Sequence, residues 1–230
     1  MSLLVALPLM AQSRISADVT VRQLNNKKVV RVEKSLYFSS NGYLVVHFTY
    51  PQEYYMVSNS LGETSVYQPA VNEVMQMQDR SLTSRSDIFT LFLTQDFSEL
   101  NLTQSGFVLK ETKRDGDKVI RTYTPTMKED KGISRVVVVL RDGQPIYCGY
   151  YDVKDKLMRK TYYSHYVAYP NYSFPTSITQ ISYDNKGDSV VRKEEYKNIK
   201  TDNFGADALF EWRVPKDARR VSPFDAKKKK

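Results

Sequence analysis

Short segments that alternate apolar and polar residues follow one another through residues 28–78, and this pattern restricts the fold more than any other feature of the chain. A period of two places the apolar residues on one face of a β-strand. Residues typical of turns separate the segments, at 39–42, 50–53, 60–63 and 69–72. The pattern predicts a meander of antiparallel strands with one apolar face. We expect such a sheet to curl, with its apolar face on the inside.

Similar strand patterns occur on both sides of this meander. A strand is predicted at residues 17–24, and Asn25-Asn26 suits the tight turn of a hairpin. Strand patterns resume at Phe107 and continue to about residue 200. Further hairpin turns are predicted at residues 115–117, 141–143 and 185–187. Near the C-terminus we expect a short helical turn at residues 206–210 and a strand at 211–214.

Residues 86–96 break the alternation and predict one helix. Ser84 or Ser86 can cap its start, where the acidic Asp87 is also favourable. The segment is apolar nearly all round, and a helix of that kind is either deeply buried or covers an apolar interior. Its apolar residues are Ile88, Phe89, Leu91, Phe92 and Leu93.

Composition is that of one globular unit rich in strand-forming residues. The 230 residues are 41% hydrophobic and include 17 Tyr and 10 Phe. No linker or repeat divides them, so we expect one domain at residues 14–226 and a basic tail at 227–230. The net charge is +8, of which the tail supplies four, and the remainder is too small to predict a nucleic-acid partner.

The first thirteen residues are expected to direct export. Residues 3–10 form an uncharged apolar run, too short for a bilayer that takes roughly 20 residues. Small and polar residues follow at 11–13. The pattern resembles a secretory signal peptide whose basic start is missing or truncated, and the alternative is an N-terminal strand. We expect a soluble exported chain after processing.

Residues suited to catalysis or metal binding are few and scattered. His47 and His165 are far apart and have no second ligand at metal-binding spacing, so neither a metal nor a cofactor is expected. Glu194 and Glu195 point to opposite faces of a strand and cannot act together as acid and base. Cys148 has no activating base nearby and is expected to be buried filler. An enzyme is therefore disfavoured, unless distant groups converge.

An apolar stripe across the predicted meander favours binding over catalysis. A sheet of this size must cover its inner face or close on itself, and one apolar helix is a small cover. A packed core is the alternative for each residue of the stripe. We expect a strongly curved, unclosed antiparallel β-barrel with a helical lid, around an apolar cavity for acyl chains. The predicted cavity residues are Leu36, Phe38, Leu44, Val46, Phe48, Met56, Val66 and Val74.

Residues 36–76 resemble the core signature of the periplasmic outer-membrane lipoprotein carrier family, the LolA-like proteins. The shared order is a strand, a turn, a strand ending before Pro51, a second turn, and a Tyr-x-Pro segment at Tyr67. The predicted helix and the closing residues 210–221 extend the resemblance over most of the chain. It implies an unclosed barrel with a lid that shelters the acyl chains of lipoproteins between the two membranes.

The resemblance also implies partners and a location. The implied partners are acylated lipoproteins or lipid as cargo, an inner-membrane ABC-type release complex and an outer-membrane acceptor. The implied location is the periplasm, where we expect the chain to be a monomer. Leu44 matches an apolar position near the family's cavity entrance, and residues 88–93 match its lid helix. The alternative is that a protein of the same fold carries another lipid or amphiphile. If residues 1–13 are not a signal peptide, a purely structural surface domain is a further alternative.

Two departures from the family pattern concern the cover of the cavity. Where the family commonly has an arginine thought to hold the lid closed, this chain has Ser40. The family also places an amphipathic helix before its first strand, and only a few residues separate the expected cleavage site from Ala17. Either the chain is truncated or one side of the cavity is covered less fully.

Overall fold

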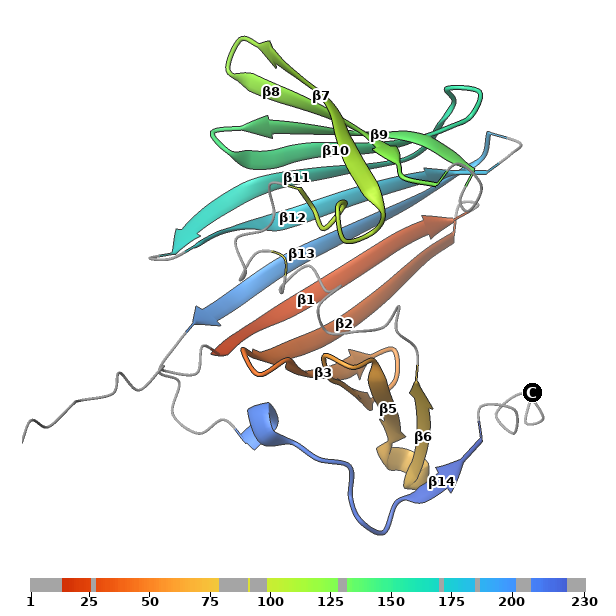
Figure 1. Cartoon of the computed structure of the whole chain (residues 1–230). Helices are drawn as coiled ribbons and strands as arrows, with labels where there is room; N and C mark the ends of the chain where they lie inside the picture. Colours follow the sequence, from red (N-terminus) through yellow and green to blue (C-terminus); the bar gives the residue numbers. More distant parts are fainter. Residues whose placement is uncertain are drawn as a thin grey trace, which may run out of the picture.

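A computed structural model describes residues 14–25, 28–78, 91, 99–127, 132–169, 172–184, 187–201 and 208–222 (Figure 1). These residues form one 14-stranded sheet and two short 3-10 helices. The N-terminal strands are β1 (Arg14–Asn25), β2 (Lys28–Ser39), β3 (Tyr43–Tyr50), β4 (Tyr54–Ser58), β5 (Glu63–Gln68) and β6 (Glu73–Gln78), with the 3-10 helix η1 (Pro69–Val71) before β6. The later strands are β7 (Phe107–Asp115), β8 (Lys118–Pro125), β9 (Ile133–Arg141), β10 (Gln144–Asp152), β11 (Leu157–Tyr169), β12 (Tyr172–Tyr183), β13 (Ser189–Thr201) and β14 (Arg219–Val221), with the 3-10 helix η5 (Ala208–Glu211) before β14.

Two antiparallel meanders make up the sheet, and one long-range pair joins them. Strands β1 to β6 follow each other in space, as do β7 to β13, and β1 pairs with β13. The sheet curls, and its edge strands β7 and β14 do not pair with each other (Figure 1). The expected strongly curved, unclosed antiparallel sheet is confirmed.

Turn chemistry explains where the strands end. Asn25 of β1 pairs with Lys28 of β2, as the predicted hairpin requires. Asp142 and Gly143 both have positive φ, at 51° and 77°, in the two-residue turn between β9 and β10. Gly42, with φ of 84°, closes the turn after β2, where an added Cβ would lie 3.0 Å from the Cβ of Ser60. Such turns favour pairing of neighbouring strands.

Two apolar clusters occupy the inner face of the sheet. The first lies over β1 to β3 and reaches β12 and β13, and the second lies over β8 to β10 under the turn that precedes β7. The buried members of the first are Ile15, Ala17, Val19, Val21, Leu36, Phe38, Leu44, Val46, Phe174, Ile178 and Tyr196. Those of the second are Leu102, Phe107, Tyr123, Val136, Val138, Leu140 and Cys148.

The C-terminal segment covers the other face of β2 to β6. The ring of Trp212 stacks on Tyr55, with ring centroids 4.3 Å apart, and the hydroxyl of Tyr43 donates to the carbonyl of Trp212 at 2.7 Å. Phe210 is buried and meets Tyr37 edge to face. Aromatic residues that alternate with the inner-face residues of β2 to β5 thus hold this segment against the outer face.

The chain ends differently from the prediction. The helical turn is present as η5, which includes Glu211, but residues 212–215 form no strand. The strand lies further on, as β14, and pairs with β6 in parallel. The expected strand at 211–214 is therefore wrong, because Trp212 and Arg213 lie against aromatic rings, Trp212 on Tyr55 and Arg213 on Tyr43, and do not join a ladder.

The predicted lid helix falls almost entirely outside the described residues. Of residues 86–96, the structure describes Leu91 alone. Within the described ranges, strands and two 3-10 helices are the only elements, so the described part does not support a helical lid. No helix in this part is both long and apolar enough to cross a membrane. The expected signal peptide and basic tail lie outside the described residues too.

Candidate functional site

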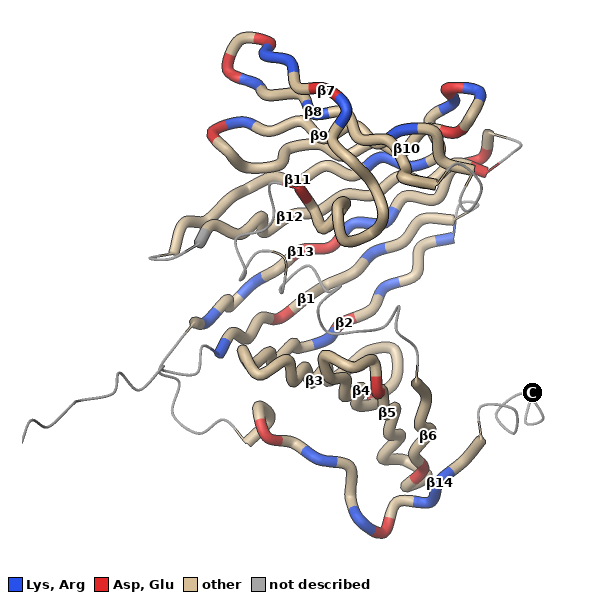
Figure 2. Tube along the Cα trace, viewed as in Figure 1, with Lys and Arg blue, Asp and Glu red and all other residues tan. Residues whose placement is uncertain are grey.

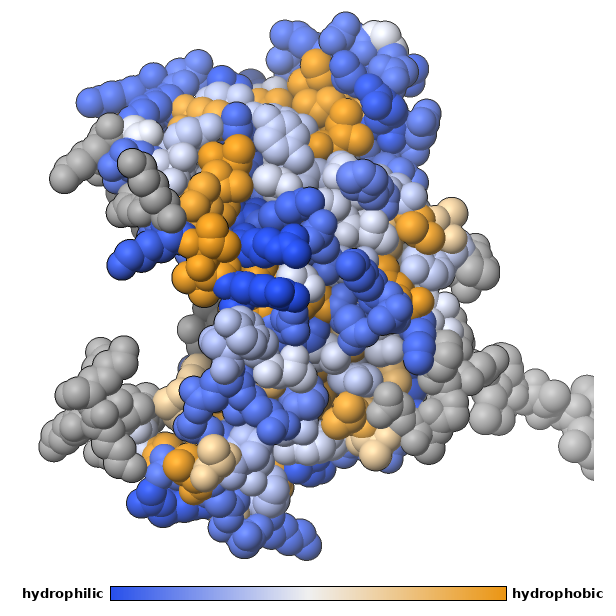
Figure 3. Space-filling model, turned by 180° about the vertical axis from the view of Figure 1, so that it is seen from behind, coloured by the Kyte–Doolittle hydropathy of each residue, from blue (hydrophilic) through white to orange (hydrophobic). Residues whose placement is uncertain are grey.

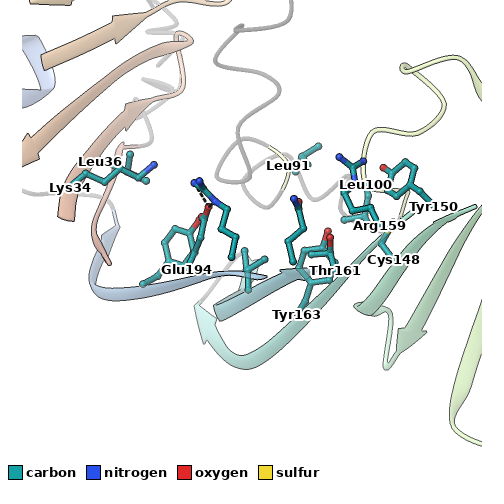
Figure 4. A pocket seen from close by; sticks show the side chains of 14 residues that line it. Lys34, Leu36, Leu91, Leu100, Cys148, Tyr150, Arg159, Thr161, Tyr163 and Glu194 are labelled. Atoms are coloured by element: carbon teal, nitrogen blue, oxygen red, sulfur yellow. Dashed lines mark hydrogen bonds and ion pairs between the residues drawn. The ribbon is translucent and has the colours of Figure 1, made fainter. Parts of the chain in front are cut away.

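A cavity of about 380 Å³ lies on the inner face of the sheet, between the two apolar clusters (Figure 4). Its floor consists of side chains from β2, β13, β12, β11 and β10, and Leu91 and Leu100 line it from the other side. The floor residues are Lys34, Leu36, Cys148, Tyr150, Arg159, Thr161, Tyr163, Ile178, Gln180, Arg192, Glu194 and Tyr196. Strands from both meanders form this site, so it depends on the β1–β13 pair.

Strand register explains why polar side chains gather in the floor. Thr161 lies opposite Gln180, and Gln180 lies opposite Arg192, so these three form one row across β11, β12 and β13. Ile178 lies opposite both Tyr163 and Glu194 in the next row. Paired residues of antiparallel strands share a face. A polar belt therefore crosses the inner face beside the apolar residues.

Glu194 is the acidic group in this floor and is well satisfied. Its Oε1 accepts from Arg192 at 2.7 Å, and its Oε2 accepts from the hydroxyl of Tyr196 at 2.6 Å. Burial by itself raises the pKa of Glu194, but the Tyr196 hydrogen bond and the charges of Lys34 and Arg192 outweigh it, so the pKa lies below its usual value. Glu194 is thus a fixed anion that positions Arg192.

Arg159 has different surroundings. Its guanidinium lies over the ring of Tyr150, with Cζ 4.0 Å from the ring centroid, and the two residues are direct partners across β10 and β11. No carboxylate among the described residues forms an ion pair with it. Burial raises the pKa of Tyr150 to about 12, so its hydroxyl stays neutral beside the arginine.

Cys148 lines the same cavity but is not activated. Its side chain is buried, and burial raises the pKa of the thiol to about 12. The thiolate is the reactive form of cysteine. The expected buried position of Cys148 is confirmed.

The groups that would suggest catalysis do not converge. Nε2 of His47 lies 2.9 Å from Glu53 Oε1, and the His47 ring stacks on Tyr55 on the outer face. His165 is exposed, with Ser164 Oγ at 3.2 Å from Nδ1. Glu194 lines the cavity, whereas its neighbour Glu195 points outward. No cluster of three His, Cys, Asp or Glu suited to a metal occurs in the described part of the chain.

Of the eight predicted cavity residues, only Leu36 is among the residues that line the cavity, and seven of them lie on the inner face. Leu36 lines the cavity, and Phe38, Leu44 and Val46 are buried with it in the first apolar cluster. Phe48 and Met56 pack against that cluster. Val66 shares their face because it pairs with Met56.

Val74 is placed on the opposite face. It pairs with Tyr67, which pairs with Tyr55 of the outer aromatic group. Met75, one residue later, pairs with Val66 and occupies the inner face instead. A one-residue difference in the register of β6 is enough to reverse the face.

Of the predicted lid residues, Leu91 lines the cavity, and Ile88, Phe89, Phe92 and Leu93 are outside the described residues. Ser40 lies in the exposed turn after β2. Most of the floor, on β10 to β13, was missed from the sequence. The available signal was the alternation within residues 148–196, where polar residues such as Arg159 and Arg192 share a face with Tyr163 and Ile178.

Charged groups also lie away from the cavity. Lys, Arg, Asp and Glu gather at the hairpin ends and recur along β1, β2 and β13 (Figure 2). On the opposite side of the molecule, hydrophilic and hydrophobic side chains lie among one another (Figure 3). On the outer face Arg22 and Lys193 both pair with Glu195, so cations there have partners.

Solved structures share this fold, whereas no family model and no curated protein matches the chain. A DUF1329 family protein from Desulfovibrio piger is 20% identical, with a TM-score of 0.56 over 87% of this chain and 90% of that one. A LolA superfamily protein from Nitrosomonas europaea is 13% identical, with a TM-score of 0.55 over 86% and 89%. A domain from Vibrio parahaemolyticus, named for outer membrane lipoprotein sorting, is 15% identical, with a TM-score of 0.56 over 86% and 88%.

These likenesses establish the class of fold to which the chain belongs. It is a curled, open antiparallel sheet with a cavity on the inner face. More particularly, it is the LolA-like fold, as the resemblance of residues 36–76 implied.

Proposed function

We propose that this chain is a carrier that shelters the acyl chains of lipoproteins, or of another amphiphile, against the inner face of its sheet. The observation that carries the proposal is the position of the cavity beside the apolar cluster of β1 to β3, with Leu36 belonging to both. Hydrocarbon that leaves water for such a surface gains about 25 cal/mol per Å². Binding of this kind needs no catalytic group.

The apolar residues of the inner face are proposed to meet the cargo when the cavity widens. They are Leu36, Phe38, Leu44, Val46, Phe48, Met56 and Val66, with residues 88–93 as the cover. The cavity of about 380 Å³ is near the small end of ligand pockets, which span roughly 300 to 1,000 Å³. A cargo with several long chains therefore requires the inner face to open.

The wider setting of this function follows the family resemblance. We propose a periplasmic monomer that receives lipoproteins from an inner-membrane ABC-type complex and delivers them to an outer-membrane acceptor. The continuous sheet from β14 to β7 supports the proposal of one domain over residues 14–226. The name of the Vibrio parahaemolyticus structure supports the choice of cargo.

A second cargo class is a smaller lipid or amphiphile. The cavity volume and the charged side chains of its floor favour it over several uncharged acyl chains. The two cargoes differ in mass, so native mass spectrometry of the protein purified from its host distinguishes them. A mass equal to that of the chain alone, with no lipid in an organic extract, would count against both.

A pair of variants on β12 tests the site. Ile178→Trp fills the cavity, whereas Thr179→Trp places the same ring on the outer face. We expect Ile178→Trp to weaken binding of a fluorescent fatty acid by about tenfold or more, since displaced contacts of about 1.4 kcal/mol give that factor. Thr179→Trp should bind like the wild type. Equal affinity for all three proteins would place the hydrocarbon elsewhere.

A further inference from the structure

The cavity floor carries more positive than negative charge. Lys34, Arg159 and Arg192 line it, and Glu194 is the one acidic residue among its lining side chains in the described part. Glu194 holds Arg192 in an ion pair at 2.7 Å and lies near enough to Lys34 to feel its charge. Among the described residues, no opposite charge pairs with Arg159 in this site.

The environment of Arg159 is that of a binding group. The guanidinium lies over the ring of Tyr150, with Cζ 4.0 Å from the ring centroid, and Arg159 is among the side chains that line the cavity (Figure 4). A planar guanidinium matches the two oxygens of a carboxylate or phosphate. Arg159 is partly buried, and cargo that fills the cavity would withdraw its charge further from water, which is costly without a counter-charge. An anionic group on the cargo offsets this cost.

Neighbouring groups can complete the contact. Thr161 follows Arg159 by two positions on the same face of β11, and Gln180 lies directly opposite Thr161. Both line the cavity and offer hydrogen-bonding groups. Apolar Leu36 and Ile178 line the cavity from β2 and β12. Polar groups thus surround Arg159, and Leu36 and Ile178 give the cavity an apolar part for a hydrocarbon chain.

We infer that the cargo is an acidic amphiphile whose carboxylate or phosphate group is bound by Arg159 while its hydrocarbon chain lies toward Leu36. This inference rests on the proposed carrier function and specifies the chemical class of its cargo. An uncharged ester would leave the guanidinium unpaired in the cavity, so the site discriminates against it. Hydrocarbon contact supplies affinity, and Arg159 supplies selectivity.

The test compares two acidic lipids, palmitate and hexadecyl phosphate, with the uncharged methyl palmitate. Each lipid competes with a fluorescent uncharged lipid for binding to the full chain. We expect the wild type to prefer the two anions by about 10- to 100-fold, the range that hydrogen bonds between charged groups provide. Arg159→Gln should lose this preference and still bind methyl palmitate, and Arg159→Lys should keep part of it. Inorganic phosphate alone should not displace the lipid.

Arg135→Gln is the matched control. Arg135 also stacks on a tyrosine, with Cζ 3.7 Å from the ring centroid of Tyr151, but it pairs with Asp155 at 2.7 Å and does not line the cavity. This variant should keep the wild-type preference. If Arg159→Gln does not fold, the preference of the wild type for the acidic lipids is measured from 20 to 500 mM NaCl. Because the cavity is open to solvent, salt should screen the charge of Arg159 and reduce this preference.

The outcomes separate the inference from the function on which it rests. Equal affinity of the wild type for acids and ester, a preference that survives in Arg159→Gln, or displacement by inorganic phosphate alone overturns the acidic cargo and leaves the carrier standing. Failure of every lipid to bind the wild type overturns both.

Discussion

Replacing Glu194 by Gln removes one charge from the cavity floor with little change of shape. The wild-type carboxylate accepts from Arg192 at 2.7 Å and from Tyr196 at 2.6 Å. The amide of Gln can accept a neutral hydrogen bond from Tyr196, but it no longer attracts Arg192. The substitution therefore tests how much the charge of Glu194 contributes to the free energy of unfolding.

The expected loss is about 2 kcal/mol. The side chain of Glu194 is 19% exposed and that of Arg192 is 40% exposed, so solvent reduces the ion pair to about 1 kcal/mol. The weaker hydrogen bond from Tyr196 adds about 1 kcal/mol, the difference between a charged and a neutral acceptor. For a chain of this length the loss lowers Tm by about 4 to 8 °C.

Thermal unfolding of wild type, Glu194→Gln and Glu195→Gln at several pH values measures this loss. Glu195 is the matched control, since it follows Glu194 but pairs on the outer face with Arg22 and Lys193, where a pair is worth about 0 to 1 kcal/mol. Because the folded pKa of Glu194 is lowered, its contribution is complete above the unfolded pKa of about 4.3 and is lost as the pH falls through the folded pKa.

The difference between wild type and Glu194→Gln should therefore shrink in acid. An unchanged Tm for Glu194→Gln at neutral pH, or an equal loss in Glu195→Gln, would refute the reasoning from burial.

Two further predictions concern the outer face and the thiol. Trp212→Ala should lower the free energy of unfolding by roughly 2 kcal/mol, which is less than the loss for a fully buried Trp because this ring is half-buried. It should also speed amide hydrogen exchange in β14. Exchange protection equal to that of the wild type would mean that the stacking on Tyr55 does not anchor the segment. Cys148 should resist iodoacetamide at pH 8 in the folded protein, because with a pKa of about 12 only about one thiol in 10,000 is ionised, and should react once urea unfolds the chain. Rapid labelling without denaturant would contradict its burial.

Local pattern was enough to predict the strands. Alternation in residues 28–78 and turn residues such as Asp142-Gly143 depend on neighbours in sequence, and both are confirmed. The face of the sheet on which each apolar residue lies was harder to predict. Val66 and Val74 look equivalent as apolar strand residues, yet the register of β6 puts Val74 on the outer face with Tyr67.

The cavity itself was predicted only in part. Leu36 was identified because it belongs to the first meander, whereas Arg159 and Glu194 lie on later strands whose spatial neighbours no local pattern reveals. From the sequence alone, Glu194 is only a candidate acid or base. Arg192 and Tyr196, which bind its two carboxylate oxygens, define it as a fixed anion.

The sequence by itself determined the strand class, the turns and, within most strands, which side chains share a face, because a period of two is a property of the local backbone. Tertiary structure decided that β1 joins β13 and that β14 joins β6. Ladder hydrogen bonds are the same for every backbone, so partner choice depends on packing over the whole sheet. Pairing of β1 with β13 brought Leu36 of the first meander and Glu194 and Arg159 of the second into the lining of one cavity, which is therefore both apolar and charged.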